Sequence, residues 1–215
     1  MSKQKFREIH APTEGGGVQF AASADRWHLR GDHVHPAPHH REGGLLRFEA
    51  NLMPFVDNPE RQALVVIDMQ NGFCSPGGWT DASGQDLERG PVLTAGSWGA
   101  QMADELVPLM REDDIHVENV RMNGFFGTHL DQVLRTQGIE TLFFTGVNID
   151  QCVTSTMEEA YFRDYNAVLL EDATATSSPD YCYDAVVFNA RHCWGFTMTT
   201  GQLAEAQPFA AGGAS

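Results

Sequence analysis

The sequence predicts an α/β fold in which a mostly parallel sheet carries helices on both faces. Three short runs rich in β-branched and aromatic residues support this fold class, at residues 63–70, 141–147 and 167–173. Segments with helical spacing follow these runs, and strands that alternate with helices are typical of parallel sheets. We therefore expect a three-layer, Rossmann-like arrangement.

The elements between these strands are predicted from apolar spacing and from capping residues. Thr128 and Gly138 mark the expected start and stop of one helix. The segment after residue 147 passes through a tight turn into a helix that begins near Cys152. The remaining predictions are a helix over 96–110, a strand over 113–120, a helix over 179–193 and a last strand over 194–200.

The chain is expected to hold one domain, because its 215 residues suit one α/β unit with an appended arm. We predict an irregular N-terminal arm with short ordered pieces over 1–60, the domain over 61–208 and a flexible tail over 209–215. Four histidines in the arm suggest a metal site, but they lack paired cysteines or carboxylates at a known spacing. A solvated or interface arm is favoured, and no metal or cofactor is predicted; the histidines are His33, His35, His39 and His40.

The charge and composition of the chain exclude some classes of binding partner. The net charge of -15 makes nucleic acid and an anionic membrane surface poor partners. No apolar run is long enough to span a bilayer, and the first residues lack a signal-peptide core, so a cytoplasmic protein is expected. The four cysteines show no CxxC spacing, which favours free thiols, one of which could be a nucleophile.

Cys152 and Asp68 are the candidate reactive pair. Cys152 follows a strand and a turn and begins a helix, where unpaired N–H groups favour a thiolate. Asp68 lies at the carboxyl end of another strand, the edge at which open α/β sheets bind ligands. An isolated cysteine would more often be inert core, and an isolated aspartate would equally well be a turn residue. Together they predict a thiol and a carboxylate in one cleft.

Four segments then resemble the isochorismatase-like cysteine hydrolases over residues 63 to about 200: IDMQNGFC, NGFFGT, TGVNIDQCVTSTMEEA and VLLEDATAT. DMQNGFCSPGGW and SSPDYC with FNARHCWGF look most like the ureidoacrylate amidohydrolase group. The resemblance implies that Cys152 attacks a small linear amide, carbamoyl or ureido compound to give a thioester, while Asp68 shuttles the proton. True isochorismatases lack the nucleophilic cysteine, so amide chemistry is favoured over vinyl-ether cleavage.

The same resemblance implies further site residues. The backbone N–H groups of Asn148 and Cys152 would form the oxyanion hole, with a cis peptide between Val147 and Asn148. For Phe73, a wall of the substrate pocket and simple loop packing are equally good interpretations. Relatives are commonly dimers or larger, so a homo-oligomer is expected. The residues assigned to substrate binding are Gln70, Phe73, Trp79, Arg121 and Phe126.

The first departure from the family is a missing lysine. Asn119 stands where the family places its third catalytic residue, and the chain's only lysines are Lys3 and Lys5. Asn119 can donate a hydrogen bond but cannot stabilise a thiolate by charge. Three alternatives stay open: Arg121 supplies the cation, the catalyst is altered or slow, or the protein binds a metabolite or partner without hydrolysis. Redox sensing through Cys152 and another thiol is a further possibility.

The second departure is a missing crossover unit between residues 85–86 and 87–88. Relatives there carry a helix, a second strand and a substrate loop, but this chain passes almost directly to PVLTAGSWGAQMADEL. The sheet either loses a strand between those bearing Asp68 and Asn119, or the neighbouring strand moves in. The zinc-binding residues of metal-dependent relatives would fall in the same segment, so a metal site of that type is not expected.

Overall fold

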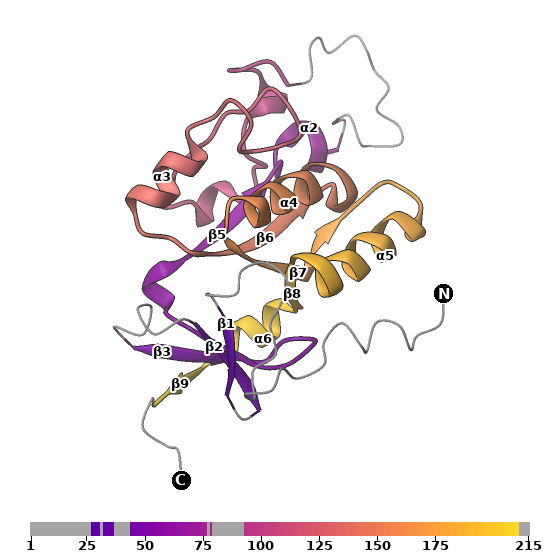
Figure 1. Ribbon diagram of the computed structural model, residues 1–215. Helices are drawn as coiled ribbons and strands as arrows, with labels where there is room; N and C mark the ends of the chain where they lie inside the picture. The colour runs from indigo at the N-terminus through magenta and orange to yellow at the C-terminus, as the bar shows by residue number, and fades with distance from the viewer. Residues whose placement is uncertain (1–26, 31, 37–43, 77, 79–92, 211–215) are drawn as a thin grey trace.

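The computed structural model describes residues 27–30, 32–36, 44–76, 78 and 93–210. Its main sheet has the strand order β5-β6-β7-β8, and all three neighbouring pairs run parallel (Figure 1). The predicted parallel α/β sheet is therefore confirmed. The strands are β5 (Gln62–Ile67), β6 (Thr141–Val147), β7 (Asn166–Ala175) and β8 (Gly195–Met198).

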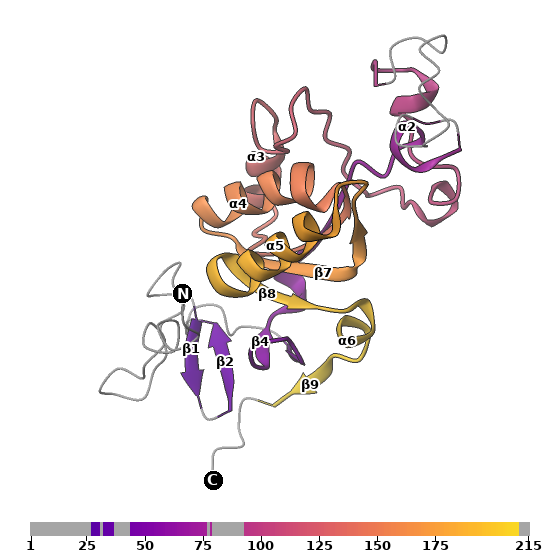
Figure 2. The same ribbon diagram turned by 90° about the vertical axis from the view of Figure 1, so that its right-hand side faces the viewer.

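One face of this sheet is covered by helices. Figures 1 and 2 both place α3, α4 and α5 on the same side of the strands. Their apolar side chains pack with Leu142, Phe144 and Leu169 of the sheet in one buried cluster. The helices are α2 (Asn71–Cys74), α3 (Leu130–Thr136), α4 (Thr154–Phe162) and α5 (Asp180–Asn189), with π-helical turns at Ile149–Val153 and Ala190–Trp194.

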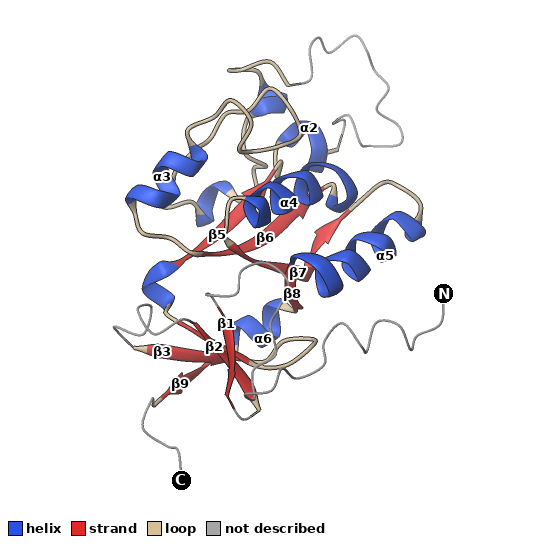
Figure 3. Ribbon diagram, viewed as in Figure 1, coloured by secondary structure: helices blue, strands red, loops and turns tan. Residues whose placement is uncertain are grey.

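The opposite face is covered mainly by a second sheet, whose strands Figure 3 shows below the first. Phe48 and Phe55 stack at 4.9 Å and pack against Phe143, Val168 and Phe196. Each crossover from β5 to β8 steps in the same direction along the sheet, and right-handed crossovers then place all their helices on one face. The second face therefore carries one helix, α6 (Thr200–Ala204), beside the strands β1 (Trp27–Arg30), β2 (His33–Pro36), β4 (Phe55–Asp57), β3 (Leu45–Phe48) and β9 (Gln207–Phe209).

The predicted N-terminal arm contains ordered pieces of three or four residues, namely strands β1 to β4. β3 pairs with β9, so residues near both ends of the described chain meet in one sheet. His39 and His40 lie outside the described residues. The boundaries at residues 60 and 208 stay predictions, although Phe209 belongs to β9.

Two predicted elements are wrong. Residues 96–110 form two 3₁₀ turns, Trp98–Ala100 and Val107–Leu109, because the backbone around residues 101–103 bonds to the loop after β5. The N–H of Ala103 donates to the Met69 carbonyl, and the N–H of Asn71 donates to the Gln101 carbonyl, both at 2.9 Å. Residues 113–120 form no strand, since no described strand pairs with them and β5 ends the sheet.

The other predicted elements are confirmed. β5, β6, β7 and β8 correspond to the predicted strands, and α5 with its π-helical turn covers 180–194. α3 begins at Leu130, whose N–H donates to the Thr128 hydroxyl, and the chain leaves it at Gly138 with φ of 69°. No helix among the described residues has the length and apolar character needed to cross a bilayer.

Candidate active site

Asp68 and Cys152 meet at the carboxyl ends of two adjacent strands. Asp68 directly follows β5 with a φ of 52°, and Cys152 lies in the π-helical turn that follows β6. β5 and β6 pair in parallel through Ile67 and Gly146, so both strands deliver their next residues to the same edge. The Cys152 thiol donates a hydrogen bond to the Asp68 carboxylate. The structure thus brings together the two side chains that the sequence singled out.

A close approach between the two strands makes this arrangement possible. Gly146 has a φ of 112°, a conformation that favours glycine. A Cβ at this position would lie 2.0 Å from the carbonyl oxygen of Ile67. Any other residue would therefore push away the end of β5 that carries Asp68.

The resting pair is a neutral thiol beside a carboxylate. Burial raises the pKa of Cys152 to about 12, and the hydrogen bond and negative charge of Asp68 act in the same direction. Burial also raises the pKa of Asp68, while the hydrogen bond from the thiol lowers it. By itself, the positive end of the helix dipole would favour a thiolate at Cys152. The raised pKa keeps the thiol protonated at rest instead. Asp68 holds the charge and can accept the thiol proton.

Two backbone N–H groups act on the sulfur. The amides of Asn148 and Cys152 both lower the pKa of the Cys152 thiol. Asn148 is buried, and its carbonyl accepts from Gln151 and Val153 at 3.1 and 3.2 Å. The Val147–Asn148 peptide is cis, as the resemblance implied. An oxygen on a carbon bonded to this sulfur would lie within reach of both amides.

Asn119 and Arg121 do not join the thiol and carboxylate. Asn119 is exposed, in the stretch that forms no strand, and within the described chain it makes no hydrogen bond to Asp68 or Cys152. The Arg121 guanidinium is also exposed and donates to the Val120 carbonyl at 3.0 Å. The pKa of Asp68 responds to burial and to the thiol, so among the described residues no cation acts on its carboxylate.

Hydroxyl groups hold the segment after Arg121 against the turn that carries Cys152. The Thr156 hydroxyl donates to the Cys152 carbonyl at 2.7 Å and accepts from the Gly124 N–H at 3.0 Å. The Asn123 amide donates to the Ser155 carbonyl at 3.1 Å, and the Ser155 hydroxyl donates to the Met122 carbonyl at 3.0 Å. Sequence reasoning missed these contacts. The pair of hydroxyl residues in the first turn of α4 was the available signal.

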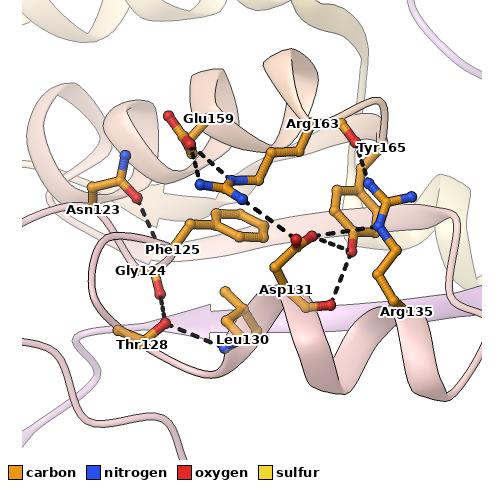
Figure 4. Close-up of polar contacts among 10 residues, drawn as sticks. All are labelled: Asn123, Gly124, Phe125, Thr128, Leu130, Asp131, Arg135, Glu159, Arg163 and Tyr165. Atoms are coloured by element: carbon orange, nitrogen blue, oxygen red, sulfur yellow. Dashed lines mark hydrogen bonds and ion pairs between the residues drawn. The ribbon is translucent and has the colours of Figure 1, made fainter.

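A second set of contacts anchors the same segment at its other end (Figure 4). Phe125 is buried, with the Arg163 guanidinium 5.4 Å from its ring and the Tyr165 ring 5.8 Å away. The Tyr165 hydroxyl donates to Asp131 at 2.8 Å, and Arg163 bridges Asp131 and Glu159 at 3.3 and 2.7 Å. α3, α4 and the start of β7 therefore fix where residues 121–128 lie.

The other predicted substrate residues differ in their surroundings. The Gln70 side chain donates to the Ala100 carbonyl at 3.0 Å, so this amide fastens the loop after β5. Phe73 is half-buried in α2, and Phe126 is 64% exposed. Trp79 lies outside the described residues. Their part in substrate binding stays a prediction.

Cys74 is a second thiol beside Asp68 that the sequence did not single out. Its sulfur lies 4.0 Å from the Asp68 carbonyl oxygen and 3.8 Å from the Met69 sulfur. Burial raises its pKa, and the charges of Glu105 and Asp68 raise it further. Within the described part of the chain, no three histidine, cysteine or acidic side chains are grouped to hold a metal ion.

Comparisons with solved structures show the same fold. A cysteine hydrolase from Pseudomonas syringae pv. phaseolicola 1448A is 21% identical, with 75% of this chain and 96% of that chain covered at a TM-score of 0.58. An isochorismatase-like hydrolase from Alkaliphilus metalliredigens is 26% identical, with 67% and 97% covered at 0.56. N-carbamoylsarcosine amidase from Thermoplasma acidophilum is also 26% identical, with 65% and 96% covered at 0.52.

The sequence itself matches a known family. The Isochorismatase domain matches residues 82–202, which is more than half of the chain. The match includes Cys152 and the Val147–Asn148 peptide, and it begins after Asp68. The structural matches above agree with it in fold. The chain therefore belongs to the isochorismatase domain family.

Proposed function

We propose that the chain is a cysteine-dependent amidohydrolase that cleaves a C–N bond of a small linear amide, carbamoyl or ureido compound. One observation carries the proposal: the Cys152 thiol donates to Asp68, and the backbone amides of Asn148 and Cys152 act on the same sulfur. A nucleophile, its base and an oxyanion site are the three parts that acyl transfer requires.

The geometry supports a two-step reaction. Asp68 takes the proton as the Cys152 sulfur attacks the carbonyl carbon, and the oxygen gains the N–H groups of Asn148 and Cys152. The C–N bond then breaks, Asp68 gives its proton to the leaving nitrogen, and a thioester remains. Asp68 next takes a proton from water as the water oxygen attacks the thioester. The C–S bond then breaks, the acid leaves, and Asp68 returns its proton to the Cys152 sulfur. This sequence of steps requires Asp68 to be unprotonated at rest.

The substrate class rests on a relative and on the sequence motifs. N-carbamoylsarcosine amidase, 26% identical, is named for a carbamoyl amide. The DMQNGFCSPGGW motif resembles the ureidoacrylate group, so a ureido acid is the finer proposal. Of the predicted substrate residues, Arg121 is the one that carries a positive charge. We propose that its exposed guanidinium pairs with the carboxylate of such a substrate.

A panel of ureido acids, carbamoyl amines and simple amides tests this proposal through ammonia release. Wild type should turn over at least one compound, and Cys152→Ala should not. Cys182→Ala is the matched control, because Cys182 is a half-buried thiol on α5 and not in the turn after β6. Equal ammonia release by wild type and Cys152→Ala would exclude the nucleophile assignment. Loss of turnover in Arg121→Ala for acids but not for neutral amides would support the ureido-acid proposal.

A second candidate function is binding without hydrolysis. It is favoured by the exposed position of Asn119 and by the lack, among described residues, of a cation acting on Asp68. Without a nearby cation, the thiolate formed as the proton transfers is less stabilised. A panel compound that binds by calorimetry but releases no ammonia would favour this candidate. Asn119→Lys would then be expected to raise turnover if the segment can bring an ammonium to the pair.

A further inference from the structure

The outer edge of β5 is unpaired within the described chain. β5 ends the strand order of the parallel sheet and hydrogen-bonds to β6 alone. Backbone groups on the outer edge of such a strand form a template for another strand. Proteins usually protect such edges with lysine, proline or a bulge, but Gln62–Ile67 reads QALVVI and contains none of these.

One face of β5 also exposes apolar side chains. Ala63, Val65 and Ile67 pack into the cluster under the helices, so Leu64 and Val66 point to the other face. Their exposed fractions are 57% and 46%. Phe143, the β6 partner of Leu64, is only 3% exposed because Phe48 of the second sheet covers it. The second sheet therefore covers this face of β6 but leaves the same face of β5 exposed.

β5 is complementary to β5 of a second copy that is related to it by a two-fold axis. If Val65 pairs with Val65 of a second copy in antiparallel register, Leu64 lies opposite Val66 on the same face. The strand has no charged residue, so this contact avoids the repulsion expected between two chains of net charge -15.

We propose that β5 is a dimer interface, in which two copies of this chain pair antiparallel through Gln62–Ile67 and bury Leu64 and Val66. The two parallel sheets then form one continuous sheet across the dimer. The pairing satisfies the free backbone groups of the edge and removes two exposed apolar side chains per copy from water. The interface is inferred from β5 alone and does not rest on the proposed hydrolase function.

Light scattering during size-exclusion chromatography of the full chain tests this interface. Wild type should elute with twice the 23.7 kDa chain mass. The double variant Leu64→Lys/Val66→Lys places lysines of the two copies opposite one another. Their repulsion should weaken dimerisation on the order of 100-fold. Leu52→Lys is the matched control, since Leu52 is similarly exposed at 44% but precedes β4 and lies outside the parallel sheet. It should leave the dimer intact.

A crosslink reports on the register even if the lysine variant fails to fold. Leu64→Cys/Val66→Cys should form a 64-to-66 disulfide between copies under copper phenanthroline, because the opposed Cβ atoms would lie about 4.5–5.5 Å apart. Leu64→Cys alone should not link to itself, and wild type reports the background from the native thiols. A monomeric wild type, a dimer unaffected by the lysines, or a double-cysteine variant without the 64-to-66 link would each overturn the proposal.

Discussion

Removing the charge of Asp68 should make Cys152 more reactive toward an alkylating reagent while abolishing hydrolysis. In Asp68→Asn, two of the causes that raise the pKa of Cys152 disappear, namely the carboxylate hydrogen bond and its charge. Burial is the largest cause and remains. The amides of Asn148 and Cys152, which lower the pKa, also remain. The pKa should therefore fall from about 12 only part of the way to the ordinary 9.0.

If the pKa of Cys152 falls by one to two units, the thiolate fraction at pH 8 rises roughly 10- to 100-fold, since each pKa unit changes the ratio of thiolate to thiol tenfold. The rate of iodoacetamide labelling should rise by that factor, because the thiolate is the nucleophile. Amide hydrolysis should be lost in the same variant, because no group then carries the proton to the leaving nitrogen.

Timed labelling followed by peptide mass spectrometry measures the Cys152 adduct over a range of pH. Cys193, which is exposed, serves as the internal reference in every sample. Asp172→Asn is the matched control: it removes another carboxylate, one that bonds to Thr200 rather than to a thiol, and should leave Cys152 labelling unchanged. If Asp68→Asn labels Cys152 at the wild-type rate, the thiol and carboxylate do not contact one another in solution.

Three further outcomes follow from other contacts. Thr156→Val leaves the Gly124 N–H without its acceptor and should cost about 1–3 kcal/mol in urea unfolding, whereas Thr156→Ser should retain most of that stability. Tyr165→Phe removes the hydrogen bond to Asp131 and should lower the unfolding free energy by about 1.5–3 kcal/mol; no change in the urea midpoint would argue against this bond. Burial raises the pKa of Asp57 to about 6, so the folded state binds more protons than the unfolded chain between about pH 4 and 6. The unfolding free energy should therefore fall by up to about 3 kcal/mol as pH rises through that window, and Asp57→Asn should remove this slope in urea titrations.

The parallel sheet and the reactive pair could be predicted because their signals are local. Each central strand is a short run of β-branched and aromatic residues, and this pattern needs little context to indicate a buried strand. Asp68 comes directly after such a strand, and Cys152 lies in the turn that follows the neighbouring one. Because carboxyl ends of adjacent parallel strands share an edge, their proximity followed from the fold class.

Elements that depend on distant partners could not be predicted. Ser97 and the apolar spacing after it favour a helix, but the Ala103 N–H bonds to Met69 instead, and this tertiary contact overrides local propensity. Residues 113–120 have the composition of a strand, but no described strand pairs with them. The segment from Met122 to Gly124 was held by hydroxyls over 30 residues further along the chain. The hydroxyl residues in the first turn of α4 indicate one side of this contact, but no local pattern identifies the segment that they bind.

The strands of the second sheet could not be predicted from the sequence because they are short. β1, β2 and β3 contain four residues each, too few to establish a period of two. β3 pairs with β4 nearby in sequence but also with β9, at the far end of the described chain. The predicted irregular arm was therefore a fair description of its composition, while its pairing depended on residues that follow the whole parallel sheet.

The apolar cluster around Phe48 and Phe55 sets an order of events during synthesis. These two rings emerge from the ribosome early, yet the side chains that bury them include Phe196 and Met198, which are translated late. Until then the aromatic pair stays in water and available to chaperones. Contacts between residues so far apart in sequence also slow folding, because a long loop must close before they form. Refolding should therefore show a late phase in which this cluster assembles after the helices have already formed.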